Sequence, residues 1–125
     1  MHRNESSENY LETILILSKR LPVVRSVDIA AEMNFKKSSI SVAMKNLRES
    51  GCITVNESGF ISLTEKGREI ADMIYERHTF LSEWLISLGV DEKTAVEDAC
   101  RMEHDISKES FAAIKKYVND SGLIS

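Results

Sequence analysis

Residues 99–105 read ACRMEHD and place three potential metal ligands within one helical turn. Cys100, Glu103 and His104 follow the spacing i, i+3, i+4, so on a helix they share one face. A thiolate, a carboxylate and an imidazole that converge on one point can bind a transition-metal ion. The alternative interpretation is a small buried cysteine beside a solvated Glu–His pair. Other parts of the sequence are needed to distinguish a metal site from this alternative.

A further histidine lies on the apolar stripe of the preceding helix. His78 follows Ile74 by four residues, so its side chain is expected on the packed face of that helix. A single histidine there is usually a core residue. A tight turn at Gly89 should fold the next helix back, and this brings the ACRMEHD segment toward His78. Together these residues favour a metal site.

The composition indicates a small globular protein. The chain has 125 residues, of which 42% are hydrophobic and 29% are charged, so we expect one or two small packed units. It has no apolar run near the roughly 18 residues that a bilayer span requires, and its N-terminus lacks the apolar segment of a signal peptide. With two unpatterned cysteines, these features predict a cytoplasmic protein with reduced thiols and no membrane partner.

Charge is distributed unevenly along the chain. The net charge is −4, yet residues 34–48 contain four basic residues and no acidic one. Residues 83–109 contain eight acidic and three basic residues. The first segment is suited to phosphates and the second attracts cations.

Apolar periodicity predicts the elements that position these groups. The predicted helices cover residues 6–20, 26–34, 38–50, 65–88 and 92–103, with a last helix after Ser107. Their predicted N-caps are Ser6 or Ser7, Ser26, Thr64, Asp91 and Ser107, and Gly51 is predicted to end the third helix in a left-handed conformation. In the second helix we expect Val27, Ala30, Ala31 and Met33 to face inward. Between the third and fourth helices, alternation at Ile53 and Val55, a turn at 56–59 and resumption at 60–63 predict a β-hairpin.

This order of elements is typical of a winged helix-turn-helix, in which the second helix of the pair enters the major groove and the hairpin lies on the adjacent backbone. The KKSS sequence at the start of the third helix offers cations, hydroxyls and backbone N–H groups to a phosphate, and outward residues farther along can reach base edges. The alternative is a solvated helix start in an all-α protein. The predicted DNA-binding residues are Arg25, Ser26, Lys36, Lys37, Ser38, Ser39, Ser41, Lys45 and Arg48.

The sequence therefore predicts a mainly α protein with a small β-hairpin wing. Residues 1–64 form an N-terminal winged helix-turn-helix, and residues 65–125 form a helical metal-binding and dimerisation domain. Apolar residues of the last helices are candidates for the homodimer face, with the intramolecular core as the alternative: Leu85, Leu88, Phe111, Ile114 and Val118.

The chain resembles the metal-dependent repressors of the diphtheria-toxin-repressor group, which includes iron-dependent repressors and manganese transport regulators. The resemblance covers about residues 6 to 120 and rests on ENYLETI, DIAAEMN, SSISVAMKNL, GFISLTEKGREIA, ERH and DACRMEH. It implies a two-domain form without the SH3-like domain of the iron branch. It also implies that Asn9 and Glu12 of the first helix complete the metal site of His78, Cys100, Glu103 and His104.

Some positions depart from the family pattern. Asn9 stands where the manganese branch has aspartate and the iron branch has methionine, Glu12 resembles the manganese branch, and Cys100 resembles the iron branch. Val96 and Ser82 stand where the family places histidine and glutamate, so we expect one well-formed metal site per subunit.

The resulting functional prediction is a metal-dependent transcriptional regulator, acting as a repressor, that binds a palindromic operator in double-stranded DNA as a homodimer when Mn²⁺ or Fe²⁺ is bound. Zn²⁺, Co²⁺ or Ni²⁺ are expected to bind in vitro, because site affinity follows the Irving–Williams order. The first alternative is a winged-helix regulator without metal control in which Cys100, next to Arg101 and near His104, is a redox switch. A metalloenzyme is disfavoured, since the chain has no HExxH motif, phosphate loop or nucleophile elbow.

Overall fold

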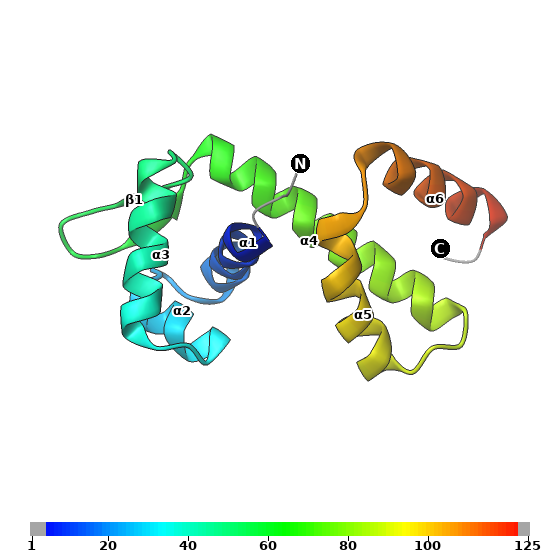
Figure 1. Cartoon of the computed structure of the whole chain (residues 1–125), viewed down its shortest axis with the longest axis horizontal. Coiled ribbons are helices and arrows are strands. Elements are labelled where there is room, and N and C mark those ends of the chain that lie inside the picture. Colours follow the sequence, from blue (N-terminus) through cyan, green and yellow to red (C-terminus); the bar gives the residue numbers. More distant parts are fainter. Residues whose placement is uncertain (1–4, 123–125) are drawn as a thin grey trace. The chain divides into compact units, whose positions relative to one another are not determined.

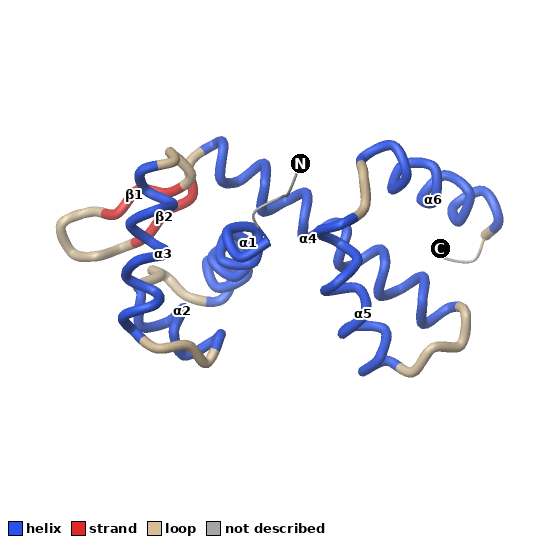
Figure 2. Tube along the Cα trace, in the orientation of Figure 1, coloured by secondary structure: helices blue, strands red, loops and turns tan. Residues whose placement is uncertain are grey.

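A computed structural model describes residues 5–122 of the chain (Figure 1). In chain order the elements are α1 (Glu5–Arg20), α2 (Ser26–Met33), α3 (Lys37–Glu49), β1 (Ile53–Val55), β2 (Ile61–Leu63), α4 (Glu65–Ser87), α5 (Glu92–Asp105) and α6 (Lys108–Ser121). Figure 2 shows the single hairpin among the helices, which confirms the predicted fold class. The chain forms two compact units: the first ends at Met73 and the second, the C-terminal unit, begins at Ile74.

The first unit, here called the reading head, contains the helix-turn-helix. Helix α2 ends at Met33, and its C-cap residue Asn34 adopts a left-handed conformation with φ of 57° and donates its backbone N–H to the Ala30 carbonyl. Asparagine tolerates this conformation better than most residues, because its short polar side chain bonds locally. The chain therefore turns within three residues and enters α3 at Lys37.

Three predicted caps are confirmed and two are wrong. Thr64 accepts a hydrogen bond from Gly67 N, and Asp91 and Ser107 likewise accept bonds from the first turns of α5 and α6. Ser6 and Ser7 lie inside α1, which already begins at Glu5.

The cap of α2 is one residue earlier than predicted. Ser26 is the first helical residue and Arg25 occupies the N-cap position. The Asp28 carboxylate accepts a hydrogen bond from Arg25 N at 2.9 Å. Asp28, three residues after the N-cap position, therefore stabilises the start of α2 in place of a capping serine.

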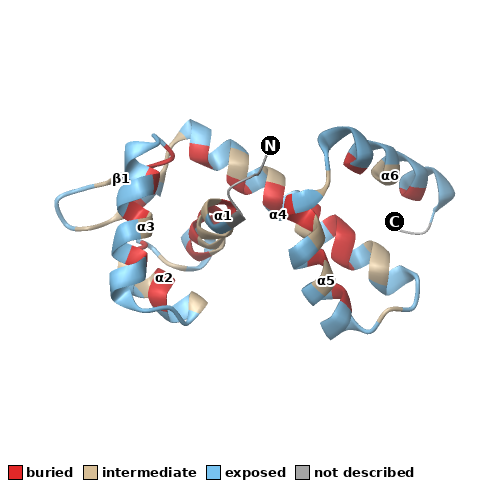
Figure 3. Ribbon diagram, viewed as in Figure 1, coloured by how far each residue is buried: buried red, intermediate tan, exposed pale blue. Residues whose placement is uncertain are grey.

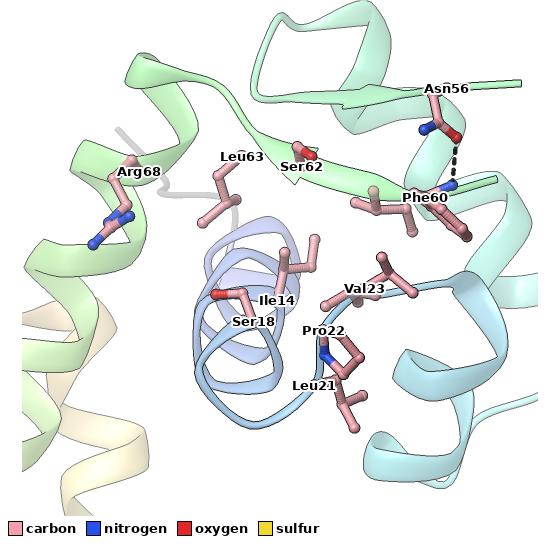
Figure 4. Close-up of a pocket in the computed structure, with 12 residues that line it drawn as sticks. Ile14, Ser18, Leu21, Pro22, Val23, Asn56, Phe60, Ser62, Leu63 and Arg68 are labelled. Carbon is pink, nitrogen blue, oxygen red and sulfur yellow. Dashed lines mark hydrogen bonds between the residues drawn. The ribbon is translucent and has the colours of Figure 1, made fainter. Parts of the chain in front are cut away.

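Strands β1 and β2 form the predicted antiparallel wing, with Val55 opposite Ile61 and Ile53 opposite Leu63. The Asn56 side-chain oxygen accepts bonds from Ser58 N and Phe60 N, both at 2.9 Å, and so holds the tip of the turn (Figure 4).

A pocket of about 330 Å³ separates the base of this wing from α1 and the 21–24 segment (Figure 4). Its lining includes Ile14, Ser18, Pro22, Phe60 and Arg68. At the pocket's edge, the Ile61 backbone N–H donates to the Val24 carbonyl at 2.7 Å, and this bond attaches β2 to the helix-turn-helix.

The core of the reading head is apolar. Its buried residues come from all three helices, the wing and the start of α4 (Figure 3): Leu11, Ile14, Leu15, Leu17, Val24, Ile29, Ala30, Ile40, Met44, Leu47, Cys52, Ile53, Ile61 and Ala71. In α2 the inward residues are Ile29 and Ala30, whereas Val27 and Ala31 are exposed, so the predicted face of α2 is partly wrong.

Helix α4 begins in close contact with the wing. A Cβ atom at Gly67 would clash with the backbone carbonyl of Cys52. Glycine is therefore required at this position for the packing of α4 against the start of β1.

The C-terminal unit has a smaller apolar cluster. Phe80, Leu81, Ala99, Phe111 and Val118 are buried in it, and the rings of Phe80 and Phe111 meet edge to face with centroids 5.5 Å apart. Phe111 and Val118, which were candidates for the dimer face, thus belong to the core of one protomer.

Two features of the surface complete the description. Leu88, one of the candidates for the homodimer face, follows the end of α4 and is 55% exposed. None of the helices between residues 5 and 121 has the length and apolar character that a membrane crossing requires.

Candidate metal centre and nucleic-acid interface

Helices α4 and α5 bring three of the predicted ligands together in the C-terminal unit. The Nδ1 atom of His78 lies 2.9 Å from Oε2 of Glu103 and 3.7 Å from Sγ of Cys100. Ligand atoms of these three residues all lie within 4.8 Å of one another. Across residues 5–122 this is the one group of three or more histidine, cysteine and acidic side chains with such spacing.

Glu103 is the most unusual member, because its carboxylate is fully buried. Oε2 contacts His78, while Oε1 has no hydrogen-bond partner among the described residues. The buried Oε1 lies 3.4 Å from Nε2 of His104 and accepts no hydrogen bond, and a positive charge close to such an oxygen is favourable. Atoms bound to one first-row metal ion at roughly 2.0–2.3 Å lie within about 4.6 Å of each other. The spread of the three side chains is close to this, and the residues fit a divalent ion.

The electrostatics of the cluster favour a protonated histidine. Hydrogen bonding to Cys100, and next to Glu103, raises the pKa of His78 from 6.5 to about 10. These two acidic groups outweigh the opposing effect of burial. At neutral pH the imidazolium therefore donates its Nδ1 proton to the Glu103 carboxylate.

His104 and the two α1 residues are placed differently. His104 is buried with its Nε2 atom 3.4 Å from Oε1 of Glu103, whereas His78 contacts the other oxygen, Oε2. It is not one of the three residues of the close group. Asn9 and Glu12 are half-buried residues of α1, one turn apart, in the reading head.

A buried arginine, which the sequence did not single out, supports the cluster. Arg77 is 1% exposed, and its Nη1 atom donates to the carbonyl oxygens of Glu103 at 3.0 Å and Ile106 at 2.7 Å. Its guanidinium also lies over the Phe111 ring, 5.6 Å from the centroid. Arg77 thereby satisfies carbonyls at the end of α5 and fixes the backbone of Glu103 against α4. The only sequence signal for it was its position beside His78.

The positions that depart from the family pattern are unsuited to a second site. Val96 is an exposed apolar residue. Ser82 is buried, and its hydroxyl donates to the His78 carbonyl at 2.7 Å within the same helix.

Helix α3 has the amphipathic character expected of a reading helix. Ile40, Met44 and Leu47 are buried in the head, while the predicted contact residues of α3 and its cap are exposed: Lys36, Lys37, Ser38, Ser39, Ser41, Lys45 and Arg48. The N-cap residue makes no side-chain cap hydrogen bond. The first backbone N–H groups of α3 are therefore available to a phosphate.

The remaining predicted contacts lie near the wing. Arg25 is exposed, and its guanidinium lies 4.8 Å from the centroid of the Phe60 ring, at the start of β2. Ser26 is half-buried at the start of α2. The outward face of α3 also contains Val42 and Asn46, which the sequence analysis did not name.

A winged helix-turn-helix joined to a helical unit with a candidate metal-ligand cluster is typical of metal-regulated DNA-binding proteins. Residues 3–59 match the family model described as "Iron dependent repressor, N-terminal DNA binding domain". Residues 64–121 match "Iron dependent repressor, metal binding and dimerisation domain". The chain belongs to the iron-dependent repressor family, whose members are metal-dependent transcriptional regulators.

Individual relatives agree with this assignment. The chain is 34% identical over 117 residues to an HTH-type transcriptional regulator of Methanocaldococcus jannaschii, covering 92% of this chain and 94% of the relative. It is 31% identical over 121 residues to the transcriptional regulator MntR of Escherichia coli O6:H1, covering 97% of this chain and 78% of that protein. The structure of the manganese regulator SloR superposes with a TM-score of 0.80 at 26% identity, over 95% of this chain and 55% of SloR. This chain thus spans about half the length of that solved structure.

Proposed function

We propose that this protein represses transcription from a palindromic operator, which it binds as a homodimer in the cytoplasm when Mn²⁺ or Fe²⁺ is bound. The observation that carries the proposal is the buried Glu103 carboxylate, which faces His78 with one oxygen and lacks a hydrogen bond at the other. In this proposal residues 1–64 act as the DNA-binding domain and residues 65–125 as the metal-binding and dimerisation domain.

His78, Cys100, Glu103 and His104 would hold the metal, and Asn9 and Glu12 would add oxygen ligands from α1. When bound, a divalent ion supplies the positive charge that balances the Glu103 carboxylate and the Cys100 thiolate. Arg77 keeps Glu103 in place throughout, because its bonds are to backbone carbonyls rather than to the liganding oxygens.

The α1 ligands are the link to DNA in this proposal. Glu12 and Asn9 lie on the helix that precedes the helix-turn-helix, so their engagement with the C-terminal ligands restricts the orientation of each reading head. A dimer reads a palindrome only when its two recognition helices are about 34 Å apart, in successive major grooves. Restricting the heads therefore raises the population of the binding-competent dimer.

The donor set points to a first-row ion without fixing which one. Cys100 offers a soft ligand, whereas Glu103, Glu12 and Asn9 offer hard oxygens. Since the site would bind Zn²⁺, Co²⁺ or Ni²⁺ at least as tightly in vitro, we propose that geometry and metal supply select Mn²⁺ or Fe²⁺.

The test is DNA binding measured against each divalent ion at buffered free concentration. Duplexes selected by the protein from a random-sequence library in the presence of Mn²⁺ serve as the probe. We expect palindromic sequences, bound by a dimer at least about 100-fold more tightly with metal than with a chelator. Equal binding with metal and with chelator would overturn metal control.

One observation favours a second candidate, a redox-controlled regulator without metal dependence. Cys100 is exposed, so an oxidant in solution can reach its sulfur, which lies 3.7 Å from Nδ1 of His78. This candidate predicts that peroxide and thiol reductant change DNA binding reversibly while a chelator is present. The metal-dependent proposal predicts no response under those conditions.

A further inference from the structure

The outward face of the reading helix α3 contains an aliphatic side chain. Val42 is 61% exposed, more than any other valine, leucine or isoleucine among the described residues. It follows the buried Ile40 by two residues, which places it on the opposite side of the helix from the core. Val42 therefore takes no part in the packing that holds α3 in the head.

Helix stability does not explain this valine either. A β-branched residue on an exposed helical face loses side-chain freedom and is a weaker helix former than alanine or lysine. The presence of a valine at position 42 is instead explained by a molecule that the outward face of α3 contacts.

The surroundings of Val42 identify that contact as DNA. Ser38 and Lys45 lie one turn before and one turn after it, and Ser41 is its neighbour in sequence, all exposed. Between Asn34 and Arg48 the chain has basic residues and no acidic one, so this face is attracted to phosphates. The serines are short, which allows the helix to approach the base edges closely enough for a valine to reach them.

The major groove presents one apolar group, the C5 methyl of thymine, among hydrogen-bond donors and acceptors. Valine cannot exchange hydrogen bonds with a base edge, so against a polar edge it would displace water without replacing its bonds. Against a thymine methyl it buries apolar surface at no such cost. We propose that Val42 is a specificity-determining residue that selects a thymine in each half-site by contact with its methyl group.

This inference uses the DNA-binding character of the family and does not depend on the ligands of the metal site. Helix α3 would then have two separate functions, positioning on the DNA backbone and selection of sequence. The lysines and the helix N-terminus position the protein on phosphates, and Val42 contributes to the choice of sequence.

The experiment replaces thymines one at a time by deoxyuridine, which removes the methyl group and leaves every hydrogen-bonding atom in place. The probe is a duplex that the parent protein selects from a random-sequence library at saturating Mn²⁺. We expect one thymine in each half-site at which the replacement weakens the parent about fourfold, the equivalent of about 0.8 kcal/mol for one buried methyl group. In Val42→Ala, thymine and deoxyuridine should bind equally well at that position.

Val27→Ala serves as the matched control, since Val27 is an exposed valine of α2, at 49%, whose loss leaves α3 intact. It should retain the full response of the parent to deoxyuridine. The proposal is overturned if Val42→Ala keeps that response, if no thymine position responds in the parent, or if selection yields no sequence preference at all.

Discussion

The reading head and the C-terminal unit differ in how far their charged and polar side chains are buried. In the head, the predicted DNA contacts of α3 are exposed, and the core beneath them is apolar. In the C-terminal unit, Arg77, Ser82, Glu103 and His104 are buried beside a small apolar cluster. The DNA contacts of α3 are therefore separate from the core of the head, whereas Glu103 and His104, two of the proposed metal ligands, belong to the buried interior of the C-terminal unit.

This difference has an energetic consequence. Exposed charges contribute little to folding stability because water solvates them in both states. A buried charge without a partner costs free energy, so replacing one member of a buried pair leaves the other member unpaired and lowers stability. Substitutions at the exposed DNA contacts of α3 should change DNA binding alone, while those at the buried charged residues of the C-terminal unit should change metal binding and stability together.

The largest effect is expected at Glu103. Glu103→Gln keeps the shape of the side chain and removes its charge, so it should lower metal affinity more than about 100-fold. Isothermal titration with Mn²⁺ measures this directly. Glu97→Gln, an exposed change on the same helix, should bind metal like the parent. Parent-like affinity in Glu103→Gln would remove the buried carboxylate from the site.

Arg77 should show the coupling of stability to the buried network. Arg77→Met leaves the carbonyls of Glu103 and Ile106 without their donor and should lower the free energy of unfolding by about 3 kcal/mol. Urea denaturation without metal provides the measurement. Arg101→Met removes only an exposed pair with Asp98 and should cost less than about 0.5 kcal/mol. Similar losses in the two variants would contradict the anchoring role of Arg77.

The pH dependence of metal affinity follows from His78. Its pKa of about 10 means that the imidazole is protonated at neutral pH, and a metal ion must displace that proton to use Nδ1. Loss of the His78 proton alone should therefore raise affinity by about tenfold per pH unit between pH 6 and 8. His78→Ala, which lacks this proton, should have a shallower slope, and equal slopes would exclude proton displacement from His78. Without metal the sign for stability is opposite: the contribution of the raised pKa is complete below 6.5 and is lost as pH approaches 10.

The smallest effect on the fold is expected in the reading head. Replacing Lys36 and Lys37 by alanine should reduce the salt dependence of DNA binding by about 1.8 in slope, roughly 0.9 for each phosphate contact. Stability should stay within about 0.5 kcal/mol of the parent, because both side chains are exposed. An unchanged slope would show that this end of α3 does not face the DNA backbone. The double variant of Lys93 and Lys108 is the control with equal loss of charge.

Sequence reasoning worked where a local rule governs the structure. Thr64, Asp91 and Ser107 cap their helices as expected, since short oxygen-bearing side chains satisfy the first N–H groups directly. The i, i+3 spacing also placed Cys100 and Glu103 on one face. The same rule wrongly predicted Ser26 as the cap of α2. The N-cap position is occupied by Arg25, and its backbone N–H is bound by Asp28, three residues farther along the helix.

Other features depend on packing between distant segments and have no local signature. From the sequence alone Arg77 is expected to be a solvated charge. Its burial follows from its hydrogen bonds to the carbonyl groups at the end of α5, which is distant in sequence. Phe111 and Val118 fit a dimer face as well as a core from their spacing, and contact with Phe80 and Leu81 places them in the core. The fold was therefore more predictable than the buried surroundings of the metal cluster.

The central claim is that the metal site controls the head through α1, and Glu12→Ala tests it most directly. The measurement follows Mn²⁺ binding and operator binding in the same variant, with Glu69→Ala, an exposed glutamate of α4, as the control. The claim predicts that Glu12→Ala still binds Mn²⁺ through the C-terminal ligands but no longer gains affinity for the operator when metal is added. If Glu12→Ala binds both metal and operator like the parent, α1 does not transmit the signal.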